Sequence, residues 1–269
     1  MLTPSNREKV EDHRVDADIE QANLTNRLFV RLGAKDRKFT KVDFRYSIFD
    51  TCYLRGCTFD SCDFTGCRFS ATSLYGSHFI GCKFDYAVFE RTIVDSDILS
   101  SSCPGHENLK MRFARTLRMN FQQLGDAQAA NQAIEVELQA TEVHLKKAWS
   151  SNESYYRAKY RRWRRWKAGF EWAEFKILDW IWGNGESTSK LLRSVALVLL
   201  VILIVDAVKF SNPWQLSSYG NSLSRAPQIF LGTLNPSNYP GWYLTLVFAI
   251  RLIAFGFFMS IVIKRFNRR

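Results

Sequence analysis

The chain has 269 residues, a length that suits one or two domains. Its mean hydropathy of −0.19 averages a polar N-terminal part with a strongly apolar C-terminal part. The net charge is +11, but residues 39–99 carry six basic and eight acidic side chains, so the positive excess lies downstream. This balance excludes a strongly acidic surface of the kind that imitates nucleic acid. Residues 1–20 are polar without an apolar signal segment, and we expect them to be cytoplasmic and either flexible or a short cap.

Large apolar residues recur every five positions over residues 39–99, a period that fits neither the 3.6 of a helix nor the 2 of a strand. It fits a solenoid in which each side of a coil takes one five-residue unit. Leu54, Leu74 and Val94 lie 20 residues apart, so four units make one coil, with aliphatic residues on one side. The thirteen centres are Phe39, Phe44, Phe49, Leu54, Phe59, Phe64, Phe69, Leu74, Phe79, Phe84, Phe89, Val94 and Leu99.

This pattern resembles the pentapeptide-repeat family, whose units read as a small residue, a polar residue, Leu or Phe, and two exposed residues. The segment Gln21-Ala22-Asn23-Leu24-Thr25 looks like one more unit. The resemblance implies a right-handed quadrilateral β-helix of about three coils over residues 21–102. Members that inhibit gyrase carry an acidic, DNA-like surface, which this segment lacks.

Five of the six cysteines occupy the small position of the repeat. We interpret them as small apolar filler, comparable to Ser, Ala or Thr. Cys62 and Cys82 fall on the same side of neighbouring coils, about 4.8 Å apart. A disulfide is conceivable there, but thiols used in this way suit a reducing compartment.

The pattern becomes helical after Pro104 and Gly105. Apolar residues at helical spacing on either side of Gly125-Asp126 predict a helical hairpin over residues 105–150. Residues 151–183 then predict a basic, aromatic juxtamembrane helix. It contacts lipid headgroups in one interpretation and a nucleic acid or nucleotide in the other, and the two are compatible if they use different faces of the helix. The contact residues are Arg157, Lys159, Arg161, Arg162, Trp163, Arg164, Arg165, Trp166 and Lys167.

Two apolar segments, residues 190–210 and 242–263, are each long enough to cross a bilayer. Basic residues precede the first segment and follow the second, where residues 264–269 form a basic tail, so both termini are expected in the cytoplasm. The loop between them, residues 211–241, predicts a short helix that starts at Pro227 and ends near Leu234. This order resembles the pore module of two-transmembrane channels, although the potassium filter is absent. The alternative is a periplasmic loop with an interfacial apolar patch.

The candidate pore and gating residues come from this loop and from the spans: Thr233, Leu234, Asn235, Asn238, Arg251, Gly256 and Asp206. Charges inside a span cost free energy and usually face a partner or water. We therefore expect an Asp206–Arg251 pair that holds the spans together, or a ring of Arg251 side chains that lines a pore and favours anions. Gly256 is either a hinge or a site of close helix packing.

No catalytic, cofactor or metal site emerges, because the four histidines are scattered and Gly183-Asn184-Gly185 lacks the residues of a phosphate loop. Two spans cannot enclose a pore alone, so a channel requires a homo-oligomer, and the resemblance implies a tetramer. A cytoplasmic sensor on a small pore also resembles the inner-membrane effectors of anti-phage systems, including the Hailong type. That likeness implies control by a nucleotide or single-stranded oligonucleotide and by the enzyme that makes it. The alternatives are a non-conducting membrane-anchored scaffold and a housekeeping or mechanosensitive channel.

Overall fold

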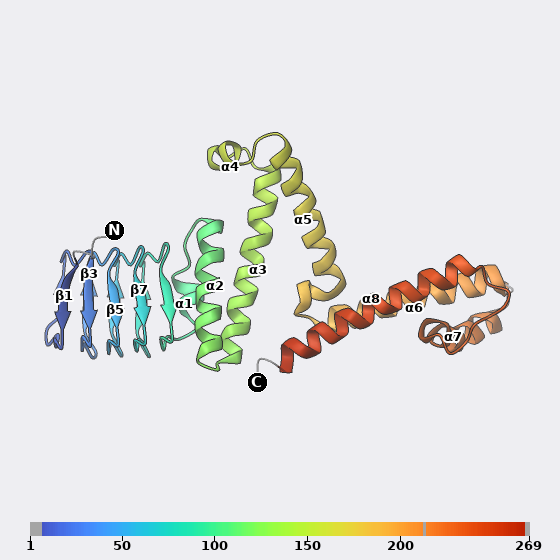
Figure 1. Cartoon of the computed structure of the whole chain (residues 1–269), viewed down its shortest axis with the longest axis horizontal. Helices are drawn as coiled ribbons and strands as arrows, with labels where there is room; N and C mark the ends of the chain where they lie inside the picture. Colours follow the sequence, from blue (N-terminus) through green and yellow to red (C-terminus); the bar gives the residue numbers. More distant parts are fainter. Residues whose placement is uncertain (1–6, 212–213, 267–269) are drawn as a thin grey trace, which may run out of the picture. The chain divides into compact units, whose positions relative to one another are not determined.

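The computed structural model describes residues 7–211 and 214–266, and the chain divides into two compact units, Met1–Gly169 and Phe170–Arg269. The first unit begins with nine short strands (Figure 1). They are β1 (Glu8–Glu11), β2 (Ile19–Glu20), β3 (Arg27–Val30), β4 (Lys38–Thr40), β5 (Ile48–Asp50), β6 (Thr58–Asp60), β7 (Arg68–Ser70), β8 (His78–Ile80) and β9 (Val88–Glu90).

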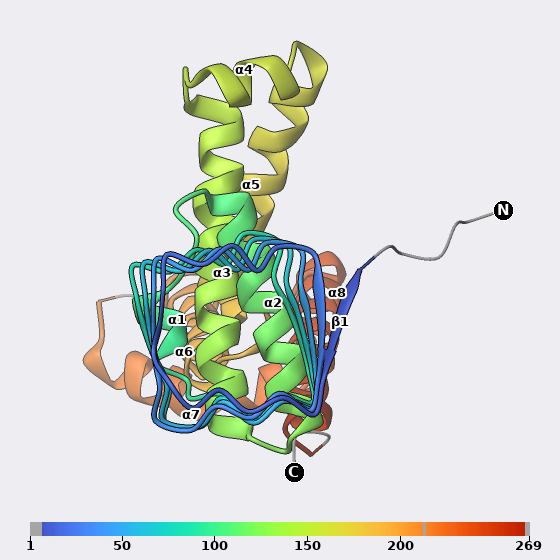
Figure 2. The same ribbon diagram turned by 90° about the vertical axis from the view of Figure 1, so that its left-hand side faces the viewer.

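The strands form two parallel sheets, ordered β1-β3-β5-β7-β9 and β2-β4-β6-β8. From β3 onward each residue pairs with the one 20 positions later, as Phe29 does with Phe49 and Phe49 with Phe69. The predicted coil of four five-residue units is therefore confirmed, and Figure 2 shows its four-sided outline end-on. The solenoid has about four turns, one more than expected.

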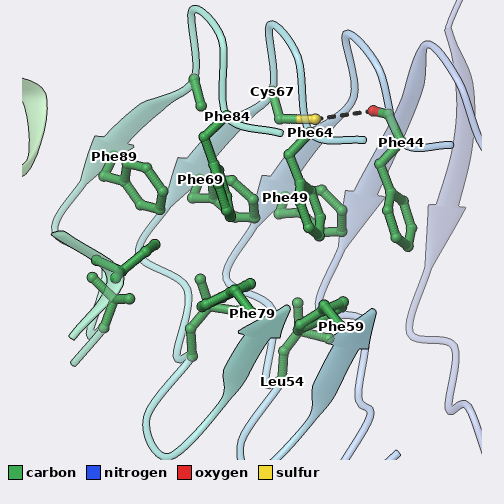
Figure 3. Packing of buried hydrophobic residues seen from close by; sticks show 14 of the residues in the cluster. Phe44, Phe49, Leu54, Phe59, Phe64, Cys67, Phe69, Phe79, Phe84 and Phe89 are labelled. Atoms are coloured by element: carbon green, nitrogen blue, oxygen red, sulfur yellow. Dashed lines mark hydrogen bonds between the residues drawn. The ribbon is translucent and has the colours of Figure 1, made fainter. Parts of the chain in front are cut away.

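The core of the solenoid is a set of stacked rings (Figure 3). Phe64 lies between Phe44 and Phe84, with ring centroids 5.1 and 5.0 Å away and nearly parallel planes. Leu54 and Leu74 stack on the aliphatic side, and both are almost fully buried. Every fifth residue from Asn26 to Arg91 has a φ between +47° and +71°, which turns the corner of the coil. The period of five is thus the length of one side plus its corner.

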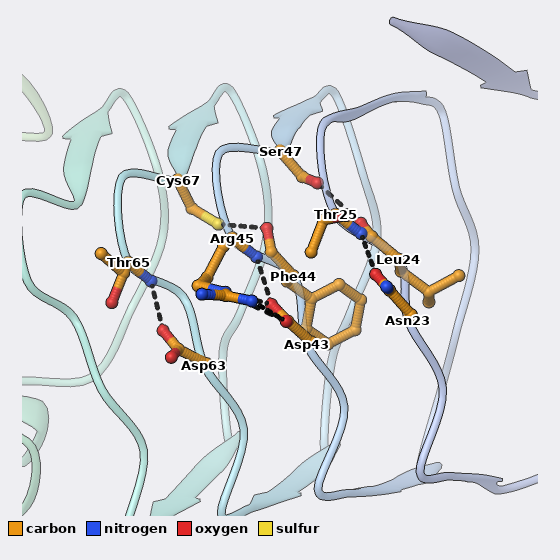
Figure 4. A network of polar contacts seen from close by, with 10 residues as sticks. All are labelled: Asn23, Leu24, Thr25, Asp43, Phe44, Arg45, Ser47, Asp63, Thr65 and Cys67. Carbon is orange, nitrogen blue, oxygen red and sulfur yellow. Dashed lines mark hydrogen bonds and ion pairs between the residues drawn. The ribbon is translucent and has the colours of Figure 1, made fainter.

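The small position does more than fill space. The Cys67 thiol donates to the carbonyl oxygen of Phe44 at 2.9 Å, and the Ser47 hydroxyl donates to that of Leu24 at 2.8 Å (Figure 4). All six cysteines are free thiols. Burial raises the pKa of Cys67 to about 12, so this thiol stays protonated and unreactive. The interpretation of these cysteines as plain apolar filler therefore omits a hydrogen bond between coils.

The expectation of a flexible segment over residues 1–20 is wrong for residues 8–20. β1 pairs with β3 and β2 with β4, so the solenoid begins well before residue 21. Val10, Val15 and Ile19 pack against the core, at intervals of five and four. This irregular spacing, without aromatic centres, hides the first coil in the sequence.

Helices close the C-terminal end of the solenoid, after α1 (Ile98–Ser101). The predicted hairpin is α2 (Glu107–Gln123) and α3 (Ala127–Ser150), with Asp126 capping α3 by accepting from the amide of Ala129. Asn120 of α2 accepts from the amide of Thr92 and donates to its carbonyl, both at 2.7 Å. α2 thus takes the place of a further coil and covers the last edge of the solenoid.

The second unit holds two candidate membrane-spanning helices, Thr188–Phe210 and Gly241–Lys264. The first comprises α6 (Thr188–Val205) and a π-helical turn, η2 (Asp206–Phe210), and the second is α8 (Gly241–Phe266). Only 22% and 11% of their most apolar 18-residue windows are buried, unlike the core helices of a soluble protein. A short turn, η1 (Gly183–Gly185), precedes α6.

The helix between the spans differs from the expectation. α7 runs from Leu216 to Leu231, so Pro227 lies inside it rather than at its start, and the helix ends before Leu234. Small residues at helical spacing, Ser218, Ser222 and Ala226, are buried and let the helix pack closely. The re-entrant course of this segment stays a prediction.

Candidate functional site

The first tie between α7 and a span involves Asp206, which is completely buried at the start of η2. Its Oδ1 lies 3.7 Å from Nη1 of Arg225 on α7. The expected Asp206–Arg251 pair is therefore wrong. The cause is α7, which lies against η2 and presents its own cation to Asp206.

Several buried polar groups accompany this pair. Neither carboxylate oxygen of Asp206 accepts a hydrogen bond within the described part of the chain, and the hydroxyls of Ser222, Tyr239 and Tyr243 are likewise unpaired there. Ser222 lies one helical turn before Arg225, and Tyr239 stacks on Phe210, one turn after Asp206. Buried polar atoms without partners are costly.

The second tie joins α8 to the other end of α7. The Arg251 guanidinium donates to the carbonyl oxygen of Leu231, the last residue of α7, and lies 4.7 Å from the centroid of the Phe248 ring. A cation at a helix C-terminus is favourable because the last carbonyls have no helical partners. Gly232 follows with a φ of +75°, and a Cβ there would collide with the Arg251 guanidinium. The positive φ favours glycine, and a side chain there would force the guanidinium to move.

The other predicted pore residues lie around the same end of α7. Thr233 and Leu234 fold back so that both amides donate to the carbonyl of Gln228. Asn235 and Asn238 are both exposed, and Asn235 lines a cavity of about 330 Å³ together with Arg251. Gly256 has open space around the position of a Cβ, so the close-packing interpretation finds no contact among the described residues.

The predicted basic aromatic helix is in fact two helices, α4 (Ser154–Lys159) and α5 (Trp163–Trp182). Arg162, between them, has a φ of +44°. Arg157 donates to the carbonyl of Ala148 at 2.8 Å, and Arg165 to that of Trp149 at 2.7 Å. Both arginines therefore donate to the last carbonyl groups of α3, and their predicted role as ligand contacts stays a prediction. The chain reversal after Ser150 brings them there.

The remaining cations and rings form what we call the basic aromatic patch: Arg161, Arg162, Trp163, Arg164, Trp166 and Lys167, all exposed. Trp163 and Trp166 are 78% and 69% exposed, unusual values for indole rings. Lys159 belongs elsewhere, because its ammonium lies near the rings of Tyr155 and Tyr160, at 5.4 and 5.6 Å. The patch thus offers planar rings and charge on one short stretch.

Residues 44–96 match the family model described as pentapeptide repeats in nine copies. Parallel strands such as β5 and β7, with inward Phe49 and Phe69, fall within that range, whereas the first coils, with Phe29 and Phe39, lie before it. This segment is a pentapeptide-repeat solenoid. The match covers the repeat alone and leaves the helical hairpin and the spans outside it. A comparison with curated proteins gives no match.

The surroundings of two residues were missed from the sequence: His144 on α3 of the helical hairpin and Arg225 on α7 of the second unit. His144 is buried, with its ring nitrogens 3.1 and 3.3 Å from the hydroxyls of Tyr160 and Tyr156. Burial, with Lys159 nearby, lowers its pKa. Arg225 is the other omission. The sequence signal for Arg225 was its position three residues after Ser222 and one before Ala226, because this spacing places it beside the packed face of a helix.

Proposed function

We propose that this chain assembles into an oligomeric pore in the bacterial inner membrane. The observation that carries the proposal is the pair of ties: α7 joins one candidate span through Arg225 and Asp206, and the other through Leu231 and Arg251. Ionisable residues at membrane depth are rare and mark ion pathways or gates. A purely anchoring pair of spans needs neither charge. Both termini would lie in the cytoplasm, following the distribution of Lys and Arg.

The pore requires several copies, because two spans cannot enclose a channel. The likeness to two-transmembrane channels favours four copies around one axis, with α7 and residues 232–238 toward the centre. Arg251 then lies close to the conduction path and influences which ions pass.

The trigger that we propose is an anionic ligand at the basic aromatic patch. Exposed arginines suit phosphate groups, and the exposed rings of Trp163 and Trp166 suit stacking on bases. A nucleotide or single-stranded oligonucleotide has both features. This fits a role in anti-phage defence, in which a partner enzyme supplies the ligand and opening of the pore depolarises the cell.

The test is membrane potential in cells that express the full chain, read with propidium iodide uptake. We expect depolarisation that is lost or altered in Arg251→Gln. Lys38→Gln, which removes an exposed cation from the solenoid, is the matched control and should behave as the wild type. Cells that keep a normal potential, combined with purified protein that passes no current with nucleotide extracts, would favour a non-conducting scaffold instead.

A further inference from the structure

An apolar groove of about 500 Å³ lies in the second unit, between the end of α5, α6 and α8. Trp180 and Ile181 form one end, Val198 and Val201 of α6 form one wall, and Phe257 of α8 forms the other. Phe230 of α7 also contributes to the lining, whereas neither Asp206 nor Arg251 does.

The wall of the groove presents hydrocarbon. Ser194 is its one hydroxyl-bearing residue apart from Tyr243, and its Oγ lies 2.8 Å from the carbonyl oxygen of Ile181 and 3.0 Å from that of Lys190. The hydroxyl is thus satisfied within the chain. A long hydrocarbon occupant fits this lining, whereas a polar solute would lose its hydration without compensation.

The rim of the groove carries a cation. The Arg193 guanidinium donates to the carbonyl oxygen of Trp180 and lies 5.1 Å from the centroid of its ring. No carboxylate pairs with Arg193 among the residues that the structure describes. The neighbouring Lys190, by contrast, is neutralised by Asp179 at 2.8 Å. The end of the groove at Trp180 therefore has one unneutralised positive charge beside an indole ring.

We propose that the groove binds an anionic phospholipid, with one acyl chain along Val198 and Val201 and the phosphate on Arg193. Charge complementarity at one end and a hydrocarbon lining along the rest are the two properties that such a lipid requires. Tryptophans favour the headgroup level of a bilayer, and Trp180 would supply such a ring beside the bound phosphate. The inference rests on the two spans lying in a bilayer, but it does not require that the protein conduct ions.

The experiment measures lipid retention by the full chain, purified in detergent and analysed by native mass spectrometry. The probes are palmitoyl-oleoyl phosphatidylglycerol and the zwitterionic palmitoyl-oleoyl phosphatidylethanolamine. We expect preferential retention of phosphatidylglycerol, reduced about fivefold by Arg193→Gln, since one cation near a membrane surface contributes about 1 kcal/mol. Lys209→Gln, at the other end of the same span, should leave retention unchanged.

A second pair of variants tests the groove itself. Val201→Trp fills it from a position that is 56% exposed, and we expect retention of both lipids to fall. Leu252→Trp adds the same ring at an exposed position outside the lining and serves as the control. The proposal would be overturned if the protein retained both lipids equally and neither Arg193→Gln nor Val201→Trp changed that retention. A photo-crosslinker at Val201 that captures a second copy of the chain rather than lipid would also overturn it. Because no current is measured, failure here is distinct from failure of the pore.

Discussion

The pairing of Asp206 with Arg225 can be tested by a double-mutant cycle. Arg225→Gln leaves a fully buried carboxylate without its cation, and removing one partner of a buried pair costs about 3–5 kcal/mol. We expect the lower end, because the Arg225 side chain is 34% exposed and the atoms are 3.7 Å apart, so solvent screens the pair. Asp206→Asn should cost less, since Arg225 can turn toward water or headgroups.

The double variant Asp206→Asn/Arg225→Gln should recover part of this loss, with a coupling free energy of about 1–2 kcal/mol. Thermal unfolding of the protein in detergent measures the stability of each variant. The same cycle on Asp206 and Arg251 should give no coupling, because Arg251 contacts Leu231 instead. Coupling between Asp206 and Arg251, with none between Asp206 and Arg225, would refute the assignment of the two ties.

Three further predictions follow from local geometry. Phe64→Ala should lower the free energy of unfolding of the solenoid by about 3–5 kcal/mol, because it removes a ring stacked on both sides. Ile80→Ala, at an exposed position, should change it by about 0.5 kcal/mol or less. Denaturant unfolding followed by circular dichroism measures both variants, and equal effects would contradict the stacked core. Gly232→Ala should lower the melting temperature because Gly232 has a positive φ and lies against Arg251. Gly256→Ala, where a Cβ meets open space, should leave the melting temperature unchanged or raise it. A lower melting temperature for Gly256→Ala than for Gly232→Ala would contradict the contact between α7 and Arg251. Folding lowers the pKa of His144 from its usual 6.5, so the folded protein binds fewer protons than the unfolded protein in acid. Amide exchange protection over residues 144–160, corrected for intrinsic rates, should therefore be full above pH 6.5 and fall as the pH drops below that value. His144→Gln should remove this pH dependence.

The solenoid could be predicted from the sequence because its pattern is local and repeated. Each inward residue, such as Phe49, packs against the residue 20 positions later, here Phe69, so the spacing alone predicts both the length of a coil and the packing partner. The first coil was missed because the interval from Val15 to Ile19 is four rather than five and no aromatic centre marks it. The two spans were found through length and apolarity alone, which need no knowledge of partners.

The partners of the charges could not be predicted in the same way. Asp206 was matched with Arg251 because both lie in the spans, but α7 was expected to be a short helix starting at Pro227, which leaves no place for Arg225. Arg157 and Arg165 have the composition of ligand contacts, and only the chain reversal after α3 reveals that they bind its last carbonyls. In each case the deciding contact depends on where a separate helix lies.

The most direct test of the proposed pore is recording from the purified full chain in planar bilayers under a potassium chloride gradient. We predict discrete unitary currents, with a reversal potential or amplitude that Arg251→Gln changes and Lys38→Gln does not. If the wild-type protein passes no current at any applied voltage, with or without nucleotide extract, the chain is not a pore. Currents indifferent to Arg251→Gln would contradict the place given to Arg251 beside the conduction path.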